Sequence, residues 1–264
     1  MKKLSIIILS YNVKKLLLEC LKSLPVHKDW EIIVVDNAST DGSGELATIR
    51  SKTNLGFAAG NNLGIKKSTG EYVLLLNPDT VVYPKTIETV LEYMEKNPQV
   101  GAATCRVELP DGNLDYSSHR SFPDPVNSFL HFIGLKGFSG YTNLRVSNQI
   151  HEIDALTGAF AMVRRTAGEQ VGWLDEDYFF NAEDIDLCYK LKEKGWKIVY
   201  IPGVKITHFK GSSSSQFRKL WAIHSTDAMR IFYRKHLECK YPFFINWAVY
   251  AGIWILKTLR SITA

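Results

Sequence analysis

Short apolar runs without polar alternation recur in the first 107 residues, and stretches of helical spacing separate them. Residues 4–9, 31–36, 72–76 and 100–107 form four such runs, rich in isoleucine, leucine and valine. Strands that are apolar on both faces are buried on both faces, which is typical of a parallel sheet covered by helices on each side. The sequence therefore predicts an α/β fold around a mostly parallel sheet.

The stretches between the runs are predicted helices because their apolar residues recur every three to four positions. Such residues follow the first run from Leu16 to Leu24, and residues 57–67 form a second predicted helix. A third begins near Pro84, which suits a first turn, and ends at Asn97, before another proline. Farther along, we expect a strand over Gly158–Val163, a helix from about Glu183 to Lys194, and strands over Lys197–Ile201 and Val204–Thr207.

The composition excludes several classes of protein. Of 264 residues, 45% are hydrophobic and 22% are charged, which is a globular composition and not that of a disordered or collagen-like chain. The net charge of +5 is too small a surplus to indicate nucleic acid as a partner. The four cysteines are widely separated, which indicates a reducing compartment rather than a disulfide framework or a zinc site. The apolar run near the N-terminus lacks a cleavage site and is interpreted as a strand, so we expect a cytoplasmic protein.

Two regions differ in composition from the rest of the chain. Between Pro110 and Ser147, proline, glycine and serine are frequent around an apolar patch, Phe129–Phe138. A loop of this length inside a compact domain is usually functional. After the serine run that ends at residue 215, a basic segment leads to an apolar tail. We therefore expect one domain over residues 1–215 and a helical region over residues 216–264.

Polar residues follow three of the predicted strands, at the edge of the sheet where ligands bind in open α/β folds. Asp36 ends the second strand and is placed to accept hydrogen bonds from a ribose hydroxyl or a base N–H. Asp79 follows the third strand and offers the carboxylate that a divalent cation on a diphosphate would need. Either aspartate also suits a turn that ends a strand. Residue type and position leave both interpretations open.

An acidic cluster and a histidine are the remaining candidates. Glu183, Asp184 and Asp186 begin a predicted helix, where acids stabilise the N-terminus by capping and through the helix dipole. The aromatic residues just before them favour a second role, because partial burial raises the pKa of a carboxylate and suits it to general base chemistry. His208 precedes a Gly/Ser segment, so it is either a metal or phosphate ligand or a packed surface residue. The Gly-rich segment at 54–64 does not predict a dinucleotide site, because SYN rather than a glycine loop follows the first strand.

In their order along the chain, these segments resemble glycosyltransferase family 2, the inverting transferases of the GT-A fold, and most closely its rhamnosyltransferase-like branch. The resemblance covers about residues 3–213 and implies a mostly parallel central sheet flanked by helices, with a C-terminal helical extension. It is carried by SIIILSYN (5–12), IIVVDNASTDGS (32–43), NLGFAAGNNLGI (54–65), GEYVLLLNPDT (70–80), GAFAMVRR (158–165), FFNAEDIDLCYKL (179–191) and HFKGSS (208–213).

The resemblance also implies roles for individual residues. Asp184 matches the second residue of the family's ED motif, the usual general base, with Glu183 beside it. Asp79 matches the last acid of the DxD motif, and His208 matches the histidine that often completes the metal or diphosphate site. The nucleotide is expected to contact Ser10, Tyr11, Asp36 and Asn61, with Asn77 in place of the first DxD acid.

For the reaction, the resemblance implies a single in-line displacement assisted by Mg²⁺ or Mn²⁺. The expected donor is dTDP-rhamnose or a UDP-sugar, and the expected acceptor is a saccharide or a polyprenyl-linked lipid in cell-surface polysaccharide synthesis. Two other interpretations stay open. A non-catalytic nucleotide-sugar-binding module would keep the fold, although the acidic cluster argues against it, and a nucleotidyltransferase would need a Gly-rich basic loop after the first strand.

The apolar tail, residues 243–256, is the membrane signal in this sequence. As a helix it covers about 21 Å, which is short of a hydrocarbon core of about 30 Å. Trp247 and Trp254 suit the interface, and the flanking lysines and arginines suit an anionic leaflet. We therefore expect an in-plane helix, peripheral on the inner face of the cell membrane. The alternative is a helix packed on the domain or on a second copy of the chain, as in a homodimer.

Overall fold

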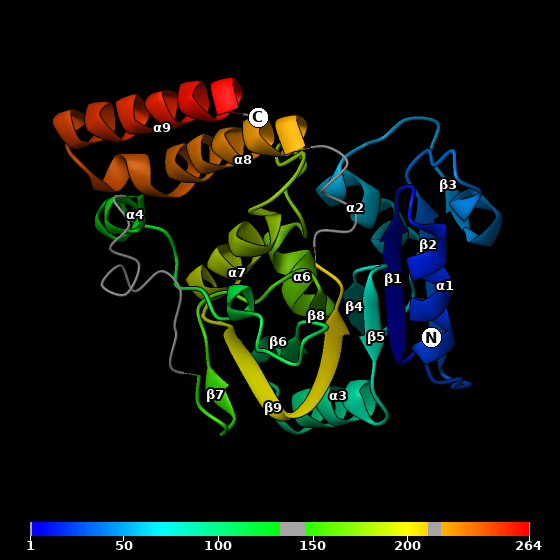
Figure 1. Ribbon diagram of the computed structural model, residues 1–264. Helices are drawn as coiled ribbons and strands as arrows, with labels where there is room; N and C mark the ends of the chain where they lie inside the picture. Colours follow the sequence, from blue (N-terminus) through cyan, green and yellow to red (C-terminus); the bar gives the residue numbers. More distant parts are fainter. Residues whose placement is uncertain (1, 133–145, 211–217, 264) are drawn as a thin grey trace.

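The computed structural model describes residues 2–132, 146–210 and 218–263 and has an α/β architecture. Helices flank both faces of one central sheet, and two further helices, at the C-terminal end, lie side by side above it in the view of Figure 1. The predicted fold class, an α/β sheet flanked by helices with a C-terminal helical extension, is confirmed. The sheet itself is mixed rather than mostly parallel, with four parallel and four antiparallel strand pairs among the described residues.

The first half of the sheet is parallel, as predicted. β1 (Leu4–Ser10) lies between β2 (Trp30–Asp36) and β4 (Tyr72–Leu76). A 3₁₀ turn, η1 (Ser43–Leu46), leads to β3 (Ile49–Arg50), which pairs with β2. Every residue of β1 and β4 is buried, because helices cover both faces of these strands. The carboxyl ends of β1, β2 and β4 consequently meet at one edge of the sheet.

An antiparallel strand interrupts this order in the second half of the sheet. β8 (Phe160–Arg164) lies between β4 and β6 (Val100–Glu108) and is antiparallel to both. β9 (Lys197–His208) runs parallel to β6, and the short strands β5 (Thr80–Val82) and β7 (His151–Glu152) pair with it in the antiparallel sense. The strand order is β3-β2-β1-β4-β8-β6-β9-β5, with β7 beside β9.

The helices enclose two apolar cores, one on each face of the sheet. α1 (Lys14–Ser23) and α3 (Thr86–Lys96) cover one face. α2 (Phe57–Lys67), α6 (Arg165–Val171) and α7 (Glu183–Glu193) cover the other. Alternate residues of β1 contribute to opposite cores, as the two-residue period of a strand requires.

Two predicted segments differ in the structure. The two strands predicted over Lys197–Ile201 and Val204–Thr207 form the single strand β9, in which Pro202 and Gly203 lie at an irregularity of the pairing. Proline and glycine are tolerated in a strand where its pairing is interrupted in this way. The apolar patch Phe129–Phe138 lies mostly outside the described residues, and its first four residues end α4 (Pro125–Phe132).

The C-terminal region is helical, as predicted. α8 (Arg218–Phe232) continues through a π-helical turn, η4 (Tyr233–Leu237), and a 3₁₀ turn, η5 (Glu238–Lys240), into α9 (Phe243–Thr263). α9 has 21 residues and extends the helix beyond the predicted apolar tail. None of the helices in the described residues is long and apolar enough to cross a bilayer.

Candidate functional site

One cleft opens at the edge of the sheet where β1, β2 and β4 end, and its volume is about 540 Å³. Its walls come from segments far apart in the sequence, including the residues after β1 and β4, the start of α7 and the end of β9. Parallel strands bring their carboxyl ends to one edge, which explains this convergence. The predicted site residues that line the cleft are Tyr11, Asn77, Asp79, Glu183, Asp184 and His208.

Strand pairing brings Asp79 and His208 together. Thr80 of β5 pairs with His208 of β9, so the residue before β5 lies beside the end of β9. His208 Nε2 is 3.3 Å from Asp79 Oδ1 and 3.4 Å from Asn77 Nδ2. Both Asp79 and His208 are buried, at 5% and 7% exposure. A carboxylate and an imidazole therefore meet in a largely desolvated part of the cleft.

Asp115, which the sequence analysis missed, is a second carboxylate at His208. It caps the 3₁₀ turn η2 (Tyr116–Ser118), its Oδ2 lies 3.7 Å from His208 Nδ1, and its Oδ1 lies 2.9 Å from Lys210 Nζ. Burial opposes ionisation of Asp115, but its polar partners, led by His208, hold its pKa well below the usual range. Burial also opposes a charged His208, but Asp115 and Asp79 outweigh it and raise the pKa of His208 to about 9.

The donor atoms around His208 fit a divalent cation that shares its coordination with phosphate oxygens. Asp79 offers carboxylate oxygens, and His208 offers an imidazole nitrogen once a cation displaces the proton that its raised pKa retains. Asn77, whose Nδ2 lies beside His208, also has a buried Oδ1 without a hydrogen-bond partner among the described residues, so it supplies a further candidate oxygen. The described residues contain no group of three or more His, Cys, Asp or Glu side chains that could hold a metal by themselves. The remaining ligands would come from a bound diphosphate and water.

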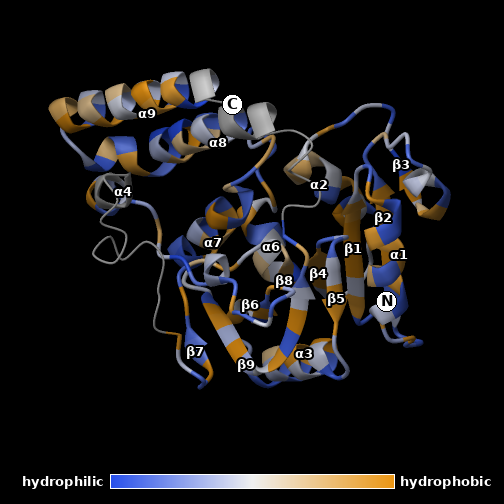
Figure 2. Ribbon diagram, viewed as in Figure 1, coloured by the Kyte–Doolittle hydropathy of each residue, from blue (hydrophilic) through white to orange (hydrophobic). Residues whose placement is uncertain are grey.

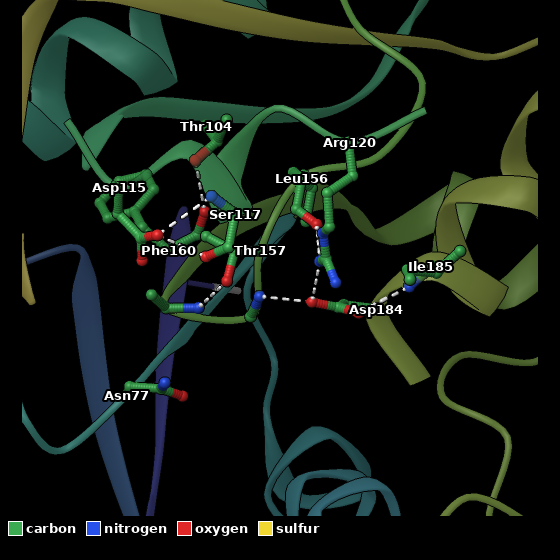
Figure 3. Close-up of polar contacts among 12 residues, drawn as sticks. Asn77, Thr104, Asp115, Ser117, Arg120, Leu156, Thr157, Phe160, Asp184 and Ile185 are labelled. Carbon is green, nitrogen blue, oxygen red and sulfur yellow. Dashed lines mark hydrogen bonds and ion pairs between the residues drawn. The ribbon is translucent and has the colours of Figure 1, made fainter. Parts of the chain in front are cut away.

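The two carboxyl groups that begin α7 have different surroundings. Asp184 Oδ2 accepts hydrogen bonds from Arg120 Nη2 at 2.6 Å and from Gly158 N at 3.2 Å (Figure 3). Glu183 is 6% exposed, and burial, followed by the adjacent Asp184, raises its pKa to about 8. Glu183 is therefore largely protonated at neutral pH, whereas Asp184 forms an ion pair. The sequence analysis missed Arg120, which stands in the long segment after β6 without a motif around it.

Asp186, the third acid of the cluster, lies outside the cleft. It is fully buried, with Oδ1 2.7 Å from His236 Nε2 and 3.2 Å from the hydroxyl of Tyr178, and with Oδ2 2.9 Å from Lys190 Nζ. Burial opposes its ionisation, but these partners, led by His236, hold the pKa of Asp186 below its usual value. Asp186 therefore fastens the π-helical turn η4 to α7.

Three of the predicted nucleotide-binding residues lie behind the wall of the cleft. Ser10 and Asp36 stand opposite each other in the β1–β2 register, and Ser10 Oγ and Asp36 Oδ1 are buried without a hydrogen-bond partner in the residues described. Asp36 Oδ2 accepts a hydrogen bond from Ser39 N at 3.2 Å, so Asp36 also stabilises a turn. Asn61 is 1% exposed within α2, and Asn37 lines the cleft instead. Nucleotide binding by Ser10, Asp36 and Asn61 stays a prediction.

Aromatic side chains form one wall of the cleft. Phe57, Phe179 and Phe180 line it, and Phe179 stacks on His224 of α8 with ring centroids 4.6 Å apart. Gly56 has a φ of +81°, and a Cβ at this position would lie 2.5 Å from Phe179 O. Only glycine fits there. The Gly-rich segment therefore serves close packing beside the cleft.

Replacing Glu183 by glutamine is expected to stabilise the protein at alkaline pH. A carboxyl group with a raised pKa in the folded state stabilises that state fully below its unfolded pKa, here the ordinary value of 4.5, and this contribution is lost as pH rises to about 8. Glutamine stays neutral throughout. We expect Glu183→Gln to raise the free energy of unfolding by about 2–4 kcal/mol near pH 9 and to leave it almost unchanged near pH 4.

Thermal unfolding at the two pH values checks this prediction. The exposed carboxyl Glu19, which pairs with Lys22 on α1, provides the control, because Glu19→Gln should change stability little at either pH. Equal midpoints for the wild type and Glu183→Gln near pH 9 would contradict the raised pKa.

Sequence comparison identifies relatives along most of the chain. The profile of glycosyl transferase family 2 matches residues 5–167. N-acetylglucosaminyl-diphospho-decaprenol L-rhamnosyltransferase of Mycobacterium tuberculosis (strain H37Rv) is 30% identical over 220 residues, which cover 74% of this chain and 71% of the relative. Rhamnosyltransferase WbbL of Escherichia coli (strain K12) is 26% identical over 193 residues, which cover 69% of this chain and 72% of the relative.

Solved structures with the same fold include a mannosyltransferase and a protein of S. aureus. One is mannosyltransferase PcManGT from Pyrobaculum calidifontis in complex with GDP-Man and Mn²⁺. It matches with a TM-score of 0.62 at 20% identity, and the match covers 99% of this chain and 72% of the PcManGT chain. The other is S. aureus TarS, which matches with a TM-score of 0.60 at 17% identity; the match covers 87% of this chain and 38% of the TarS chain. At these identities the two structures establish the likeness of the fold alone.

Proposed function

The chain belongs to glycosyltransferase family 2, and from this premise we propose that it transfers a sugar, with inversion at the anomeric carbon, from a nucleotide-diphosphate donor to an acceptor hydroxyl in polysaccharide synthesis. One observation carries the proposal: Asp79, His208 and Asp184 line the same cleft. The first two suit a metal-bound diphosphate and the third suits a proton acceptor, and inverting transfer needs both in one space.

The relatives favour rhamnose as the sugar. Both relatives named above are rhamnosyltransferases, and the one from M. tuberculosis is named for N-acetylglucosaminyl-diphospho-decaprenol. We therefore assign dTDP-rhamnose as the donor, with a UDP-sugar as the competing choice, and a saccharide carried on a polyprenyl diphosphate as the acceptor. Residues 1–215 are the proposed catalytic unit, and residues 216–264 are the proposed helical extension.

The reaction is proposed to be a single in-line displacement. Asp184 takes the proton of the acceptor hydroxyl as that oxygen bonds to the anomeric carbon, and the bond to the diphosphate breaks with its electron pair on the leaving oxygen. Asp79 and His208 would hold a Mg²⁺ or Mn²⁺ ion, whose charge stabilises the leaving diphosphate. Tyr11 and Asn77 line the cleft and are proposed to contact the nucleotide. Contacts from Ser10, Asp36 and Asn61 stay a prediction, because these side chains are buried behind the wall of the cleft.

A thermal-shift panel of dTDP-, UDP- and GDP-sugars, with and without Mn²⁺, tests this proposal. We expect dTDP-rhamnose with Mn²⁺ to stabilise the protein most, by about 2.7 kcal/mol at a hundredfold excess over Kd. Hydrolysis of the bound donor distinguishes an enzyme from a binding module of the same fold. Stabilisation by nucleoside triphosphates alone would instead indicate a nucleotidyltransferase, and no response to any sugar nucleotide would contradict the proposal.

The C-terminal helix α9 turns its charged side chains inward and its apolar side chains outward. Lys257 Nζ lies 2.6 Å from Asp227 Oδ1, and Arg260 Nη1 lies 2.8 Å from Ser225 Oγ, so both cations are directed to α8. Figure 2 shows the hydrophobic residues that recur along α9. Its exposed large apolar side chains are Phe243, Phe244, Trp247, Trp254, Ile255 and Leu259.

We assign this outward face of α9 to the surface of an anionic membrane, where the protein would be peripheral on the cytoplasmic side. A run of exposed aromatic side chains is unfavourable in water but suits the interface of a bilayer. The same helical region exposes Arg230, Arg234 and Lys240, whose positive charges attract acidic headgroups. A protein held there would meet a polyprenyl-linked acceptor at the membrane.

Three glutamates on this face are expected to abolish membrane binding and to leave the cleft intact. The variant Phe244→Glu/Trp247→Glu/Trp254→Glu should lose at least about tenfold in binding to phosphatidylglycerol-containing vesicles, measured by co-sedimentation. Val26→Glu, at a fully exposed apolar residue near the N-terminus, is the control and should bind as the wild type does. Unchanged binding of the triple variant would remove the membrane assignment, and a wild-type dimer that the three glutamates split would assign the face to a second copy.

A further inference from the structure

We propose that Arg120 is a positioning residue for the glycosyl transfer proposed above: it makes Asp184, rather than its neighbour Glu183, the charged carboxylate of the cleft and fixes the direction in which that carboxylate points. The inference rests on the proposed function, because it concerns the group assigned as the general base. Nothing in it requires Arg120 to touch the donor or the acceptor.

The carboxylate of Asp184 is held from three directions. Its Oδ2 lies 2.6 Å from Arg120 Nη2 and 3.2 Å from Gly158 N, and its Oδ1 accepts a hydrogen bond from Ile185 N at 2.8 Å (Figure 3). The side chains of Arg120 and Asp184 are only 16% and 13% exposed. Salt and water screen an ion pair of this kind much less than a surface pair.

Arg120 is itself fixed by the backbone of the segment that precedes β8. Its main chain forms an antiparallel bridge with Ala155, in which Ala155 N donates to Arg120 O at 3.0 Å. Its Nη2 also donates to Leu156 O at 2.9 Å. Residues 155–158 therefore bind Arg120 and, through Gly158 N, the same oxygen of Asp184. The guanidinium approaches the carboxylate from one defined direction.

Arg120 determines which acid of the pair Glu183 and Asp184 is ionised, because the neighbouring charges already compensate one another. Asp186, on the same helix, is already compensated by Lys190 and His236. Glu183 Oε2 is buried and has no hydrogen-bond partner in the part of the chain that the structure describes. Glu183 is buried and Asp184 is largely buried. Two adjacent acids that share a compensating cation in such surroundings do not both ionise readily, and the acid in contact with the cation keeps the charge. The raised pKa of Glu183, about 8, agrees with this division.

The division of charge matters because a general base must be ionised and correctly oriented when the acceptor hydroxyl arrives. Without Arg120, Glu183 and Asp184 would share protons as a coupled pair, and the base would be lost at a higher pH than in the wild type. Loss of Arg120 should therefore act through the pH dependence of the rate and not through donor affinity.

The test compares Arg120→Gln and Arg120→Lys with the wild type over a pH series, by initial rate of transfer and by donor Kd. We expect Arg120→Gln to move the acidic limb of the rate profile upward by about 1–3 pH units, to lower the rate near pH 6.5 by about 10–100-fold, and to change donor Kd less than threefold. Arg120→Lys keeps the charge and should restore most of the pH profile. Arg106→Gln removes a similar arginine–carboxylate pair, with Glu108, outside the cleft and should leave the profile unchanged.

A second measurement needs no turnover. Carboxyl ¹³C titration of the donor-free protein should show that the titration midpoint of Asp184 rises in Arg120→Gln. The midpoint of Asp111, followed in the same samples as a control, should stay constant. An unmoved Asp184 midpoint and an unmoved acidic limb would overturn the inference. Failure of the proposed function is distinct, because it would appear as a wild-type protein that transfers no sugar.

Discussion

Asp184→Asn is expected to lower the rate of sugar transfer by about 10²–10⁴-fold, which is the usual contribution of a general base. Asparagine keeps the size of the side chain and an oxygen that accepts hydrogen bonds, but it cannot take the proton of the acceptor hydroxyl. Donor affinity should change little, because the diphosphate is assigned to Asp79 and His208. Transfer rates and donor Kd, measured separately on the same preparation, check this expectation.

The comparison needs two controls. Asp184→Asn removes the carboxylate of a largely buried ion pair with Arg120, whose side chain is 16% exposed. Loss of such a pair is destabilising, so thermal unfolding must show that the variant is folded at the assay temperature. Asp154→Asn removes a carboxylate that pairs with Lys192 outside the cleft and should transfer sugar at the wild-type rate. Normal turnover by folded Asp184→Asn would show that another group is the base.

Asp79→Ala is expected to weaken donor binding in the presence of Mn²⁺ by at least about tenfold, with little difference from the wild type in EDTA. The Asp79 carboxylate is the negatively charged donor assigned to the metal. Without it, the assigned ligands are the uncharged amide of Asn77 and His208, which is either neutral or a cationic imidazolium, so the metal is held more weakly. Isothermal titration with the nucleoside diphosphate, with and without the metal, measures the effect without turnover.

Asp111→Ala is the matched control for this experiment, since Asp111 lies in the exposed turn after β6. It should bind the nucleotide as the wild type does in both conditions. If Asp79→Ala reduced binding equally with Mn²⁺ and in EDTA, Asp79 would contact the nucleotide directly, and the metal assignment would be wrong.

The strands and helices in the first half of the chain were predictable because their buried positions are apolar residues at a regular spacing in the sequence. α2 and β4 have the predicted bounds, since each is a continuous apolar or amphipathic segment between turn residues. The direction of β8 was not predictable, because its four buried apolar residues, Phe160–Val163, read the same for a parallel or an antiparallel strand. The helix predicted from Pro84 begins at Thr86, after Lys85 adopts a positive φ of 63°, a local conformation that propensity does not reveal.

The site was predictable where short motifs follow the ends of strands. Asn77, Asp79 and the start of α7 stand beside elements whose ends meet at one edge, so their convergence follows from topology. Arg120 and Asp115 escaped prediction, because each is a single charged residue in a long irregular segment, and only tertiary contact identifies its partner. Asp36 shows the opposite case: a residue in a matching motif lies behind the cleft, and Asn37 beside it lines the wall.

The pairing of β5 with β9 has a consequence for biosynthesis. Asp79 and His208 come from opposite halves of the polypeptide and become neighbours only when the last strand of the sheet adds to the short one. A nascent chain that has left the ribosome only as far as β8 already contains the aspartate but lacks the histidine. In this arrangement nucleotide affinity would be acquired late in translation, and sugar-nucleotide capture would serve as a reporter of completed assembly.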